Sequence, residues 1–274
     1  MNLKPFFDPN SIAVIGATDE EGSVGLELCR NLKESDKTLF FVNPNRDEVL
    51  GKDTYESVKD IEQQVDLVVV AVPAEVVLDV VKQIPESTKA AIVISAGFAE
   101  SGDAGERRQE KLKEILSDKD ILLLGPNCLG VISPSNNLNV SFAPATPEKG
   151  SVAFLSQSGA LIDSVIDKSL VEGYGFSTLV SLGNQADVNI QDLLNYFKND
   201  DATEAIALYL EGIPQAAGKK FIEKAQEVTQ EKPVVVLKAG VTEKGKEAAG
   251  SHTGSLAGNS QVYKAAFRKA GIFQ

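Results

Sequence analysis

The chain has 274 residues, 43% of them hydrophobic and 24% charged, and its 39 acidic and 27 basic side chains leave a net charge of −12. This length predicts roughly two domains of about 100–150 residues each. The acidic balance argues against nucleic acid as a partner, because a phosphate backbone attracts a basic face. No apolar run approaches the ~20 residues of a membrane-spanning helix, and no signal peptide is visible, so we expect a cytoplasmic protein without a membrane partner.

In the first half, short apolar runs rich in β-branched residues alternate with helical patterns. Continuous apolar runs, without period-two alternation, are typical of strands that are covered on both faces of a parallel sheet. The pattern predicts a doubly wound α/β domain over residues 1–132. Its strands are expected at residues 11–18, 39–45, 66–74, 90–98 and 121–127, and its helices at 24–33, 76–83 and 105–116.

Residues 133–149 are rich in Pro, Ser and Asn and show no periodicity, so we interpret them as a linker. The β-α succession then restarts and predicts a second α/β domain over residues 150–274. Most strands of both halves end in small or polar residues. Because ligands of open α/β sheets lie outside the carboxyl ends of the strands, two binding crevices are expected. The second-half strands are expected at residues 151–159, 177–184, 204–212 and 233–240.

The segment GATDEEGSVG (16–25) follows the first strand and precedes a helix, with Ser23 at the predicted helix start. This is the position of a phosphate cradle at a helix N-terminus. The glycine spacing is not G-x-G-x-x-G, and the second strand ends in NPNR (43–46), where an NAD site prefers an acidic residue. The segment is therefore either a structural glycine turn or a site for a nucleotide-bearing ligand other than NAD.

The segment LSQSGAL (155–161) places Ser156 and Ser158 where a strand turns into a helix. Two hydroxyls and free N–H groups at a positive helix end are a natural seat for phosphate. The serine nucleophile elbow of hydrolases is an alternative, but the glycine two residues before the serine is missing. Glu211 ends a neighbouring strand. It is either a surface glutamate or a carboxylate that orients an imidazole.

His252 is the only histidine of the chain and lies in the glycine-rich segment GSHTGSLAG (250–258). With no second histidine, and with Cys29 and Cys128 outside any metal-type spacing, a zinc site lacks ligands, so no metal site is expected. A loop imidazole of this kind suits a nucleophile that accepts a transferred group. A solvated loop histidine is the alternative.

Several segments occur in the order of a known family: GATDEEGSVG, NPN, VDLVVVAVPA, ISAGFAE, GPNCLG, SQSGA, LEGI and SHTGSLAG. On these segments the chain resembles the NDP-forming acyl-CoA synthetases, and most closely the CoA-binding half of the ADP-forming acetyl-CoA synthetases. The resemblance implies a Rossmann-like CoA-binding domain followed by a flavodoxin-like ligase domain. It also implies the reaction acyl-CoA + phosphate + ADP ⇌ acid + CoA + ATP, with acetate or another small carboxylic acid.

The resemblance assigns roles to residues of this chain. His252 would take the phosphoryl group and Glu211 would orient it, while Ser156, Ser158 and Gly159 would hold phosphate. Coenzyme A would lie across Gly16, Thr18, Ser23, Asn43, Arg46, Pro73, Ser95, Ala96, Gly97 and Asn127.

The sequence contains no P-loop and no nucleotide-binding ATP-grasp region. We therefore expect ATP or ADP, with Mg, to bind a β-type ATP-grasp subunit or domain, and the assembly to be a hetero-oligomer or dimer. Two alternatives remain open. One is a non-catalytic sensor of CoA or acyl-CoA. The other is an NAD-dependent dehydrogenase, which the glycine spacing disfavours.

Overall fold

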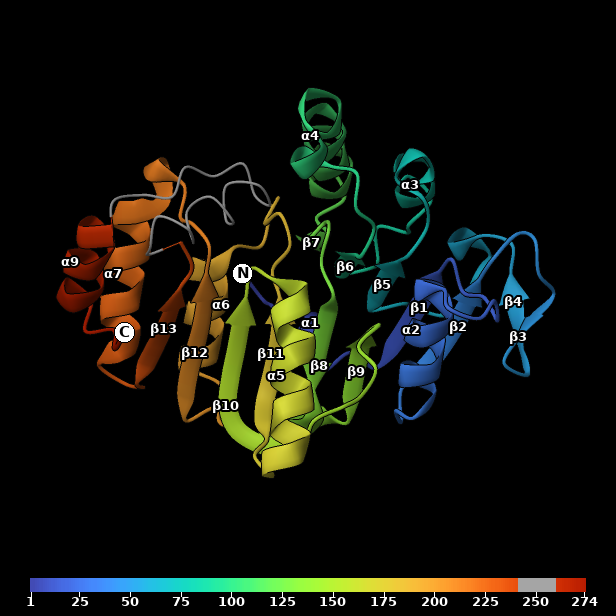
Figure 1. Ribbon diagram of the computed structural model, residues 1–274. Coiled ribbons are helices and arrows are strands. Elements are labelled where there is room, and N and C mark those ends of the chain that lie inside the picture. The colour runs from blue at the N-terminus through green and yellow to red at the C-terminus, as the bar shows by residue number, and fades with distance from the viewer. Residues whose placement is uncertain (241–259) are drawn as a thin grey trace.

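The computed structural model describes residues 1–240 and 260–274 and contains two β-sheets that lie side by side (Figure 1). In the described residues, the strand order is β3-β4-β2-β1-β5-β6-β7 in the first sheet and β13-β12-β10-β11-β8-β9 in the second. Both sheets alternate with helices along the chain, which confirms the α/β prediction.

The first sheet is parallel except for the short edge strand β3, which pairs with β4 in the antiparallel direction. The central strands β1, β5 and β6 are buried along their whole length, as their continuous apolar runs predicted. The strands are β1 (Ser11–Ile15), β2 (Thr38–Val42), β3 (Glu48–Val49), β4 (Lys52–Tyr55), β5 (Leu67–Val70), β6 (Ala90–Val93) and β7 (Leu122–Leu124). The helices are α1 (Lys4–Phe7), α2 (Val24–Lys33), α3 (Ala74–Val81) and α4 (Asp103–Ser117), with 3-10 turns η1 (Val58–Asp60) and η2 (Ala99–Ser101).

The second sheet is mixed, because β10 to β13 are parallel whereas β8 runs antiparallel to both β11 and β9. Helix α5 covers the face toward the viewer in Figure 1, and α6 lies behind the sheet. The strands are β8 (Gly130–Ser133), β9 (Leu138–Ser141), β10 (Lys149–Ser156), β11 (Phe176–Ser181), β12 (Ala205–Leu210) and β13 (Val234–Lys238). The helices are α5 (Gly159–Glu172), α6 (Ile190–Lys198), α7 (Gly218–Thr229) and α9 (Ser260–Lys269), with turns η3 (Pro134–Asn136) and η4 (Gln215–Ala217).

The expected linker, residues 133–149, contains the 3-10 turn η3 and strand β9, neither of which the sequence analysis expected. Strand β9 was missed because two of its four residues are polar. Asn139 and Ser141 are nevertheless buried and bonded: Ser141 Oγ donates to Asn139 Oδ1 at 2.6 Å, and Asn139 Nδ2 donates to Thr146 Oγ1 at 2.8 Å. The division into domains at residues 132 and 150 stays a prediction.

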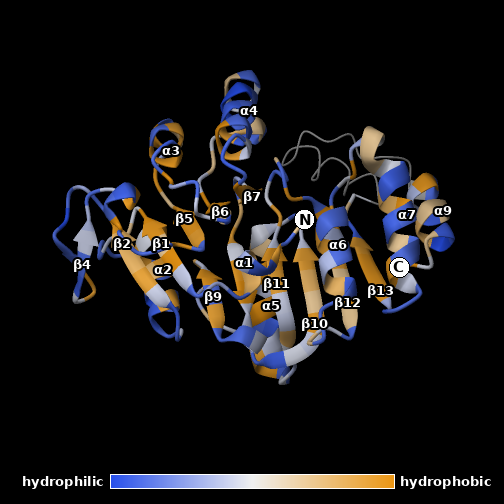
Figure 2. Ribbon diagram, turned by 180° about the vertical axis from the view of Figure 1, so that it is seen from behind, coloured by the Kyte–Doolittle hydropathy of each residue, from blue (hydrophilic) through white to orange (hydrophobic). Residues whose placement is uncertain are grey.

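One hydrophobic cluster extends through both sheets. It joins Ile12 of β1 and Ile92 of β6 to Val180 of β11 and Leu208 of β12, and each of these side chains is buried. Helix α1 contributes Phe7, whose ring centroid lies 4.6 Å from Tyr196 and 5.2 Å from Phe197 of α6. The strands of both sheets are accordingly mostly hydrophobic in Figure 2, whereas polar residues dominate the outward side of α4. None of the helices in the described ranges has the length and apolar character to cross a membrane.

Candidate active site

A cavity of about 1130 Å³ opens at the carboxyl ends of strands from both sheets. The crevice expected in the second half and part of the crevice expected in the first are thus one space, because the ends of β5, β6 and β7 face those of β10 and β12 across it. From the first half it is lined by Val24, Ala71, Val72, Pro73, Ile94, Ser95, Ala96, Asn127, Cys128 and Leu129. From the second half it is lined by Phe142, Gln157, Ser158, Gly159, Ala160, Asp163, Tyr209, Glu211, Ala239 and Gly240.

The turn between β10 and α5 has the form of an anion seat. Ser158 is the N-cap of α5, and its Oγ accepts the N–H of Leu161 at 3.3 Å. Ser156 is fully buried and shapes the turn, since its Oγ donates to the Ser158 carbonyl at 2.7 Å and accepts the Ser158 N–H at 3.0 Å. The N–H groups of Gly159 and Ala160 have no hydrogen-bond acceptor within the described ranges, and both residues line the cavity. Because α5 has no acidic residue in its first turn, its dipole favours an anion there.

Glu211 follows β12 and is joined to this turn by Gln157, a residue that the sequence analysis did not single out. The backbone N–H groups of Glu211 and Gly212 donate to Gln157 Oε1 at 2.6 and 3.1 Å, and Gln157 Nε2 donates to the Gly212 carbonyl at 2.9 Å. The side chain of Gln157 therefore holds the carboxylate-bearing strand end beside the turn between β10 and α5.

Lys238, at the end of β13, is a second residue that the sequence analysis missed. Its Nζ donates to the carbonyls of Glu211 and Ala239 at 2.8 and 2.6 Å and lies 4.6 Å from the ring centroid of Tyr263. Burial lowers the pKa of Lys238, and the charge of Glu211 opposes that shift. Lys238 thus connects the ends of β12 and β13. The segment that contains His252 follows β13 in the sequence.

Three titratable groups on the cavity wall have pKa values shifted toward their neutral forms. Burial raises the pKa of Asp163, and the charge of Asp167 raises it further. Burial also raises the pKa of Tyr209, with a second contribution from Glu211. Burial raises the pKa of Cys128 to about 12, so this thiol is a poor nucleophile at neutral pH.

Four of the predicted CoA contacts, Pro73, Ser95, Ala96 and Asn127, lie on the cavity wall. Gly97 does not line it, and its N–H donates to Glu100 Oε1 at 2.5 Å. That N–H is therefore occupied within the protein.

The remaining predicted CoA contacts, Gly16, Thr18, Ser23, Asn43 and Arg46, form a cluster of turns beyond β1 and β2. Asn43 Nδ2 donates to the Ala17 carbonyl at 2.8 Å, Arg46 pairs with Asp19, and Ser23 caps α2 by accepting the Leu26 N–H at 3.2 Å. At Gly16, where φ is +93°, a Cβ atom would lie 2.4 Å from the Ala71 carbonyl oxygen, so glycine is required there. The structure brings these residues together but not onto the cavity wall, apart from the adjoining Val24.

His252 lies outside the described residues, which resume at residue 260. Within the described ranges, no group of three His, Cys, Asp or Glu side chains could hold a metal ion.

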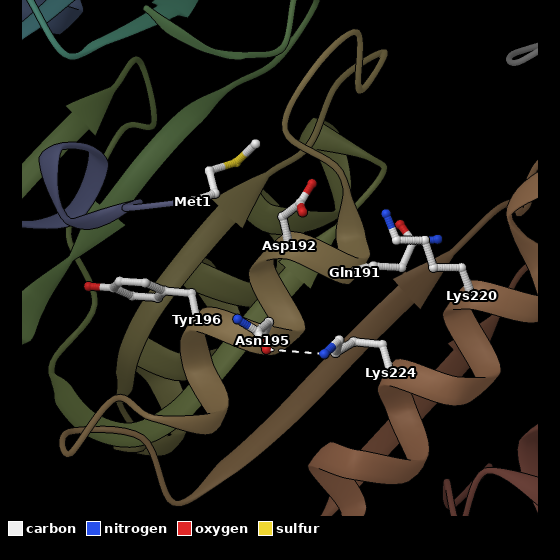
Figure 3. A pocket seen from close by; sticks show the side chains of 7 residues that line it. All are labelled: Met1, Gln191, Asp192, Asn195, Tyr196, Lys220 and Lys224. Carbon is white, nitrogen blue, oxygen red and sulfur yellow. Dashed lines mark hydrogen bonds between the residues drawn. The ribbon is translucent and has the colours of Figure 1, made fainter. Parts of the chain in front are cut away.

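Figure 3 shows a smaller hollow of about 210 Å³ between α6 and α7. It is lined by Met1, Gln191, Asp192, Asn195, Tyr196, Lys220 and Lys224, and Lys224 Nζ donates to Asn195 Oδ1 at 3.2 Å. None of the predicted site residues lines this hollow, so the larger cavity is the candidate active site.

Comparison with known proteins places each half in a described family. Residues 10–134 match the model of a CoA-binding domain, and residues 149–274 match that of a succinyl-CoA ligase-like flavodoxin domain. The two matches together define the class as a CoA-binding protein with a flavodoxin-like ligase domain, in agreement with the two fold types that the resemblance implied.

Proteins of similar sequence and structure point to one group of enzymes within this class. The chain is 43% identical to the α subunit of acetate–CoA ligase [ADP-forming] II of Pyrococcus furiosus, over 98% of this chain and 59% of that protein. It is 42% identical to acetate–CoA ligase [ADP-forming] of Methanocaldococcus jannaschii, over 99% of this chain and 38% of that protein. The solved acetyl-coenzyme A synthetase 1 of Ca. Korarchaeum cryptofilum, in complex with phosphate and ADP, superposes with a TM-score of 0.94 at 39% identity, covering 99% of this chain and 59% of that chain.

The chain is therefore similar, over almost its whole length, to the NDP-forming acyl-CoA synthetases, in agreement with the resemblance that its sequence motifs carry. It spans between 38% and 59% of the length of these three relatives.

Proposed function

We propose that this chain is the CoA-binding, phosphohistidine-carrying part of an ADP-forming acyl-CoA synthetase. The proposed reaction is acyl-CoA + phosphate + ADP ⇌ carboxylic acid + CoA + ATP, with acetate or another small carboxylic acid. The observation that carries the proposal is the single cavity, in which the predicted CoA contacts Ser95 and Asn127 face the phosphate turn at Ser158–Gly159 and Glu211. The names of the relatives support the same reaction.

The first step is attack of phosphate on the thioester. Phosphate sits at the start of α5, where the N–H groups of Gly159 and Ala160 and the helix dipole stabilise its charge. A phosphate oxygen attacks the thioester carbon, the new C–O bond forms, and the C–S bond breaks. Acyl phosphate results, and CoA leaves as a thiolate that then takes up a proton.

The second step transfers the phosphoryl group to His252. The unprotonated ring nitrogen of His252 attacks phosphorus, and the bond to the acyl oxygen breaks, so the carboxylate leaves. The Glu211 carboxylate accepts the other ring N–H and stabilises the positive charge that develops on the imidazole. Gln157 and Lys238 hold the backbone of Glu211 for this task.

The third step needs a nucleotide site. An ADP oxygen attacks the phosphohistidine and ATP forms, while the imidazole is released. We assign the nucleotide, with Mg, to a β-type ATP-grasp subunit or domain, so full turnover requires a hetero-oligomer or a longer chain. The α-subunit names of relatives and the ADP and phosphate of the solved relative support this assignment.

The test is phosphorylation of the full-length protein by acyl-CoA and phosphate. Intact mass spectrometry after incubation with acetyl-CoA and phosphate, with and without a nucleotide-binding partner, should show one acid-labile phosphate. His252→Asn should stay unmodified, and Glu211→Gln should be modified much more slowly. Glu204→Gln, an exposed carboxylate just before the same strand, is the matched control and should behave as the wild type.

Two outcomes would contradict the proposal. Phosphate on the His252→Asn protein would place the acceptor elsewhere. Persistent absence of phosphate in a protein that binds CoA would leave the non-catalytic sensor as the function.

A further inference from the structure

The loop after β11, residues 183–188, extends from the second sheet and lies against the first. Backbone N–H groups of Asn184, Ala186 and Val188 donate to the carbonyls of Pro126, Gly125 and Leu123 at 2.9, 3.0 and 3.0 Å. At Gly183, where φ is +56°, a Cβ atom would lie 2.2 Å from the Pro126 carbonyl oxygen. The approach is therefore backbone against backbone, and it places the Asn184 side chain among residues of the first half.

The amide of Asn184 bonds to three side chains, all from the first half. Its Nδ2 donates to the Glu100 carboxylate and, at 2.8 Å, to Gln109 Oε1. Its Oδ1 accepts Asn127 Nδ2 at 3.2 Å. All three of these hydrogen bonds are thus made to the first half and none to its own sheet.

Glu100, which accepts a hydrogen bond from Asn184, is also hydrogen-bonded to the turn at residues 95–98. Its Oε1 accepts the N–H groups of Gly97 and Phe98 at 2.5 and 3.0 Å. Burial raises the pKa of Glu100, but the hydrogen bonds from Asn184, Phe98 and Gly97 outweigh it, and the pKa lies below its usual value. The carboxylate is therefore ionised at neutral pH, and its bonds are charge-assisted.

Asn127 and the turn meet at the cavity. The Asn127 N–H donates to the Ser95 carbonyl at 3.0 Å, and Ser95, Ala96 and Asn127 line the cavity, whereas Asn184 and Glu100 do not. One N–H of Asn127 Nδ2 donates to Asn184, which fixes the orientation of the amide, and the Oδ1 of Asn127 accepts no hydrogen bond from the described residues and can accept a donor from a ligand.

We propose that Asn184 is a positioning residue for the CoA half of the cavity. It holds the 95–98 turn through Glu100, and it orients the Asn127 amide so that Oδ1 accepts an N–H or O–H of the ligand. The identity of that ligand as CoA rests on the proposed function. In consequence, the affinity for a ligand that contacts the end of the first sheet depends on Asn184, a side chain from a loop of the second sheet.

The test is calorimetric titration of the full-length protein with CoA. Asn184→Ala should weaken binding by roughly tenfold, the effect of losing a net hydrogen bond to a charged group. Asn184→Asp should bind more weakly still, because it sets a carboxylate against Glu100. Gln185→Ala is the matched control from the same loop: Gln185 Oε1 accepts the Ile190 N–H of the second half, so its loss should leave CoA affinity unchanged.

A reciprocal exchange separates positioning from general damage. In the double variant Glu100→Gln, Asn184→Asp, the new amide at 100 can donate to the new carboxylate at 184 and still accept from Gly97 and Phe98. Gln109 can turn its amide to donate as well. CoA affinity should recover to within a few-fold of the wild type, which non-specific loss of structure would not allow.

The proposal is overturned if Asn184→Ala binds CoA as tightly as the wild type. It is also overturned if the double variant melts like the wild type and yet shows no recovery of affinity. If the wild-type protein binds no CoA, the proposed function fails separately. Hydrogen exchange at the Gly97 and Phe98 amides then decides: faster exchange in Asn184→Ala supports the positioning role, and equal exchange refutes it.

Discussion

Replacement of Lys238 by methionine isolates one buried cation. Lys238 is only 7% exposed, and methionine has a similar length, so the substitution fills the space and removes the charge and its donors. What it leaves behind are the carbonyls of Glu211 and Ala239, which Lys238 Nζ contacts at 2.8 and 2.6 Å. The loss of the cation–π contact with Tyr263 adds to the effect.

The magnitude follows from these two carbonyls. A buried acceptor that loses its donor costs about 1–3 kcal/mol, and removal of the desolvated ammonium offsets part of that. We expect Lys238→Met to lose about 2–4 kcal/mol of unfolding free energy and about 5–10 °C in Tm. Glu211 should also be less firmly placed, so the proposed phosphorylation of His252 should slow.

The pH dependence gives an independent check. Burial holds the pKa of Lys238 below its ordinary value of 10.5, so between the folded pKa and 10.5 the unfolded state binds more protons than the folded state. In the wild type, this group should therefore raise the free energy of unfolding as the pH increases through that window. Lys238→Met should lack this contribution.

Thermal melts from pH 7 to 10 measure both effects, with Lys219→Met as the control, since the Lys219 side chain is 89% exposed. A Lys238→Met protein that melts at or above the wild-type temperature, with the same pH slope, would refute the reasoning.

Three further predictions concern the cavity wall. Ser158→Ala should lose about 1 kcal/mol in denaturant unfolding and Ser158→Gly only a few tenths, because glycine tolerates the N-cap position; equal losses would contradict this. Burial raises the pKa of Asp163, so the unfolding free energy of the wild type should fall as the pH rises from 3.8 through the folded pKa. Asp163→Asn should remove that fall and gain up to about 1 kcal/mol of unfolding free energy at pH 7, a small gain because the group is partly solvated. A Tm below that of the wild type at pH 7 would argue against this. Cys128, with a pKa of about 12, should resist iodoacetamide at pH 8 until the protein is denatured, and rapid labelling of the native protein would disprove its burial.

The sequence predicted the buried elements best. Helix α2 has the bounds expected for it, residues 24–33, because its apolar face and the Ser23 cap are both local signals. Buried parallel strands were equally visible as apolar runs. Strand β9 was not, since two of its four residues, Asn139 and Ser141, are polar and yet buried.

The same distinction applies to the site. Strand ends are local signals, and they indicated Ser95, Asn127, Ser158 and Glu211, which the fold brings to one cavity. The roles of Gln157, Lys238 and Asn184 depend on partners 54, 27 and 84 positions away in the sequence. Such contacts follow from strand register and loop packing, which no short motif encodes.

The continuous core that joins Ile12 and Ile92 to Val180 and Leu208 has a consequence for the history and engineering of such proteins. A half borrowed from another member of the family would meet foreign side chains along the whole shared seam, and mismatched volumes there cost stability. Chimaeras that join the halves of two relatives near residue 140 should therefore fold poorly. They should fold well only when the core residues on both sides of the seam come from the same relative. The CoA half and the phosphate half are expected to have diverged as a single inherited unit.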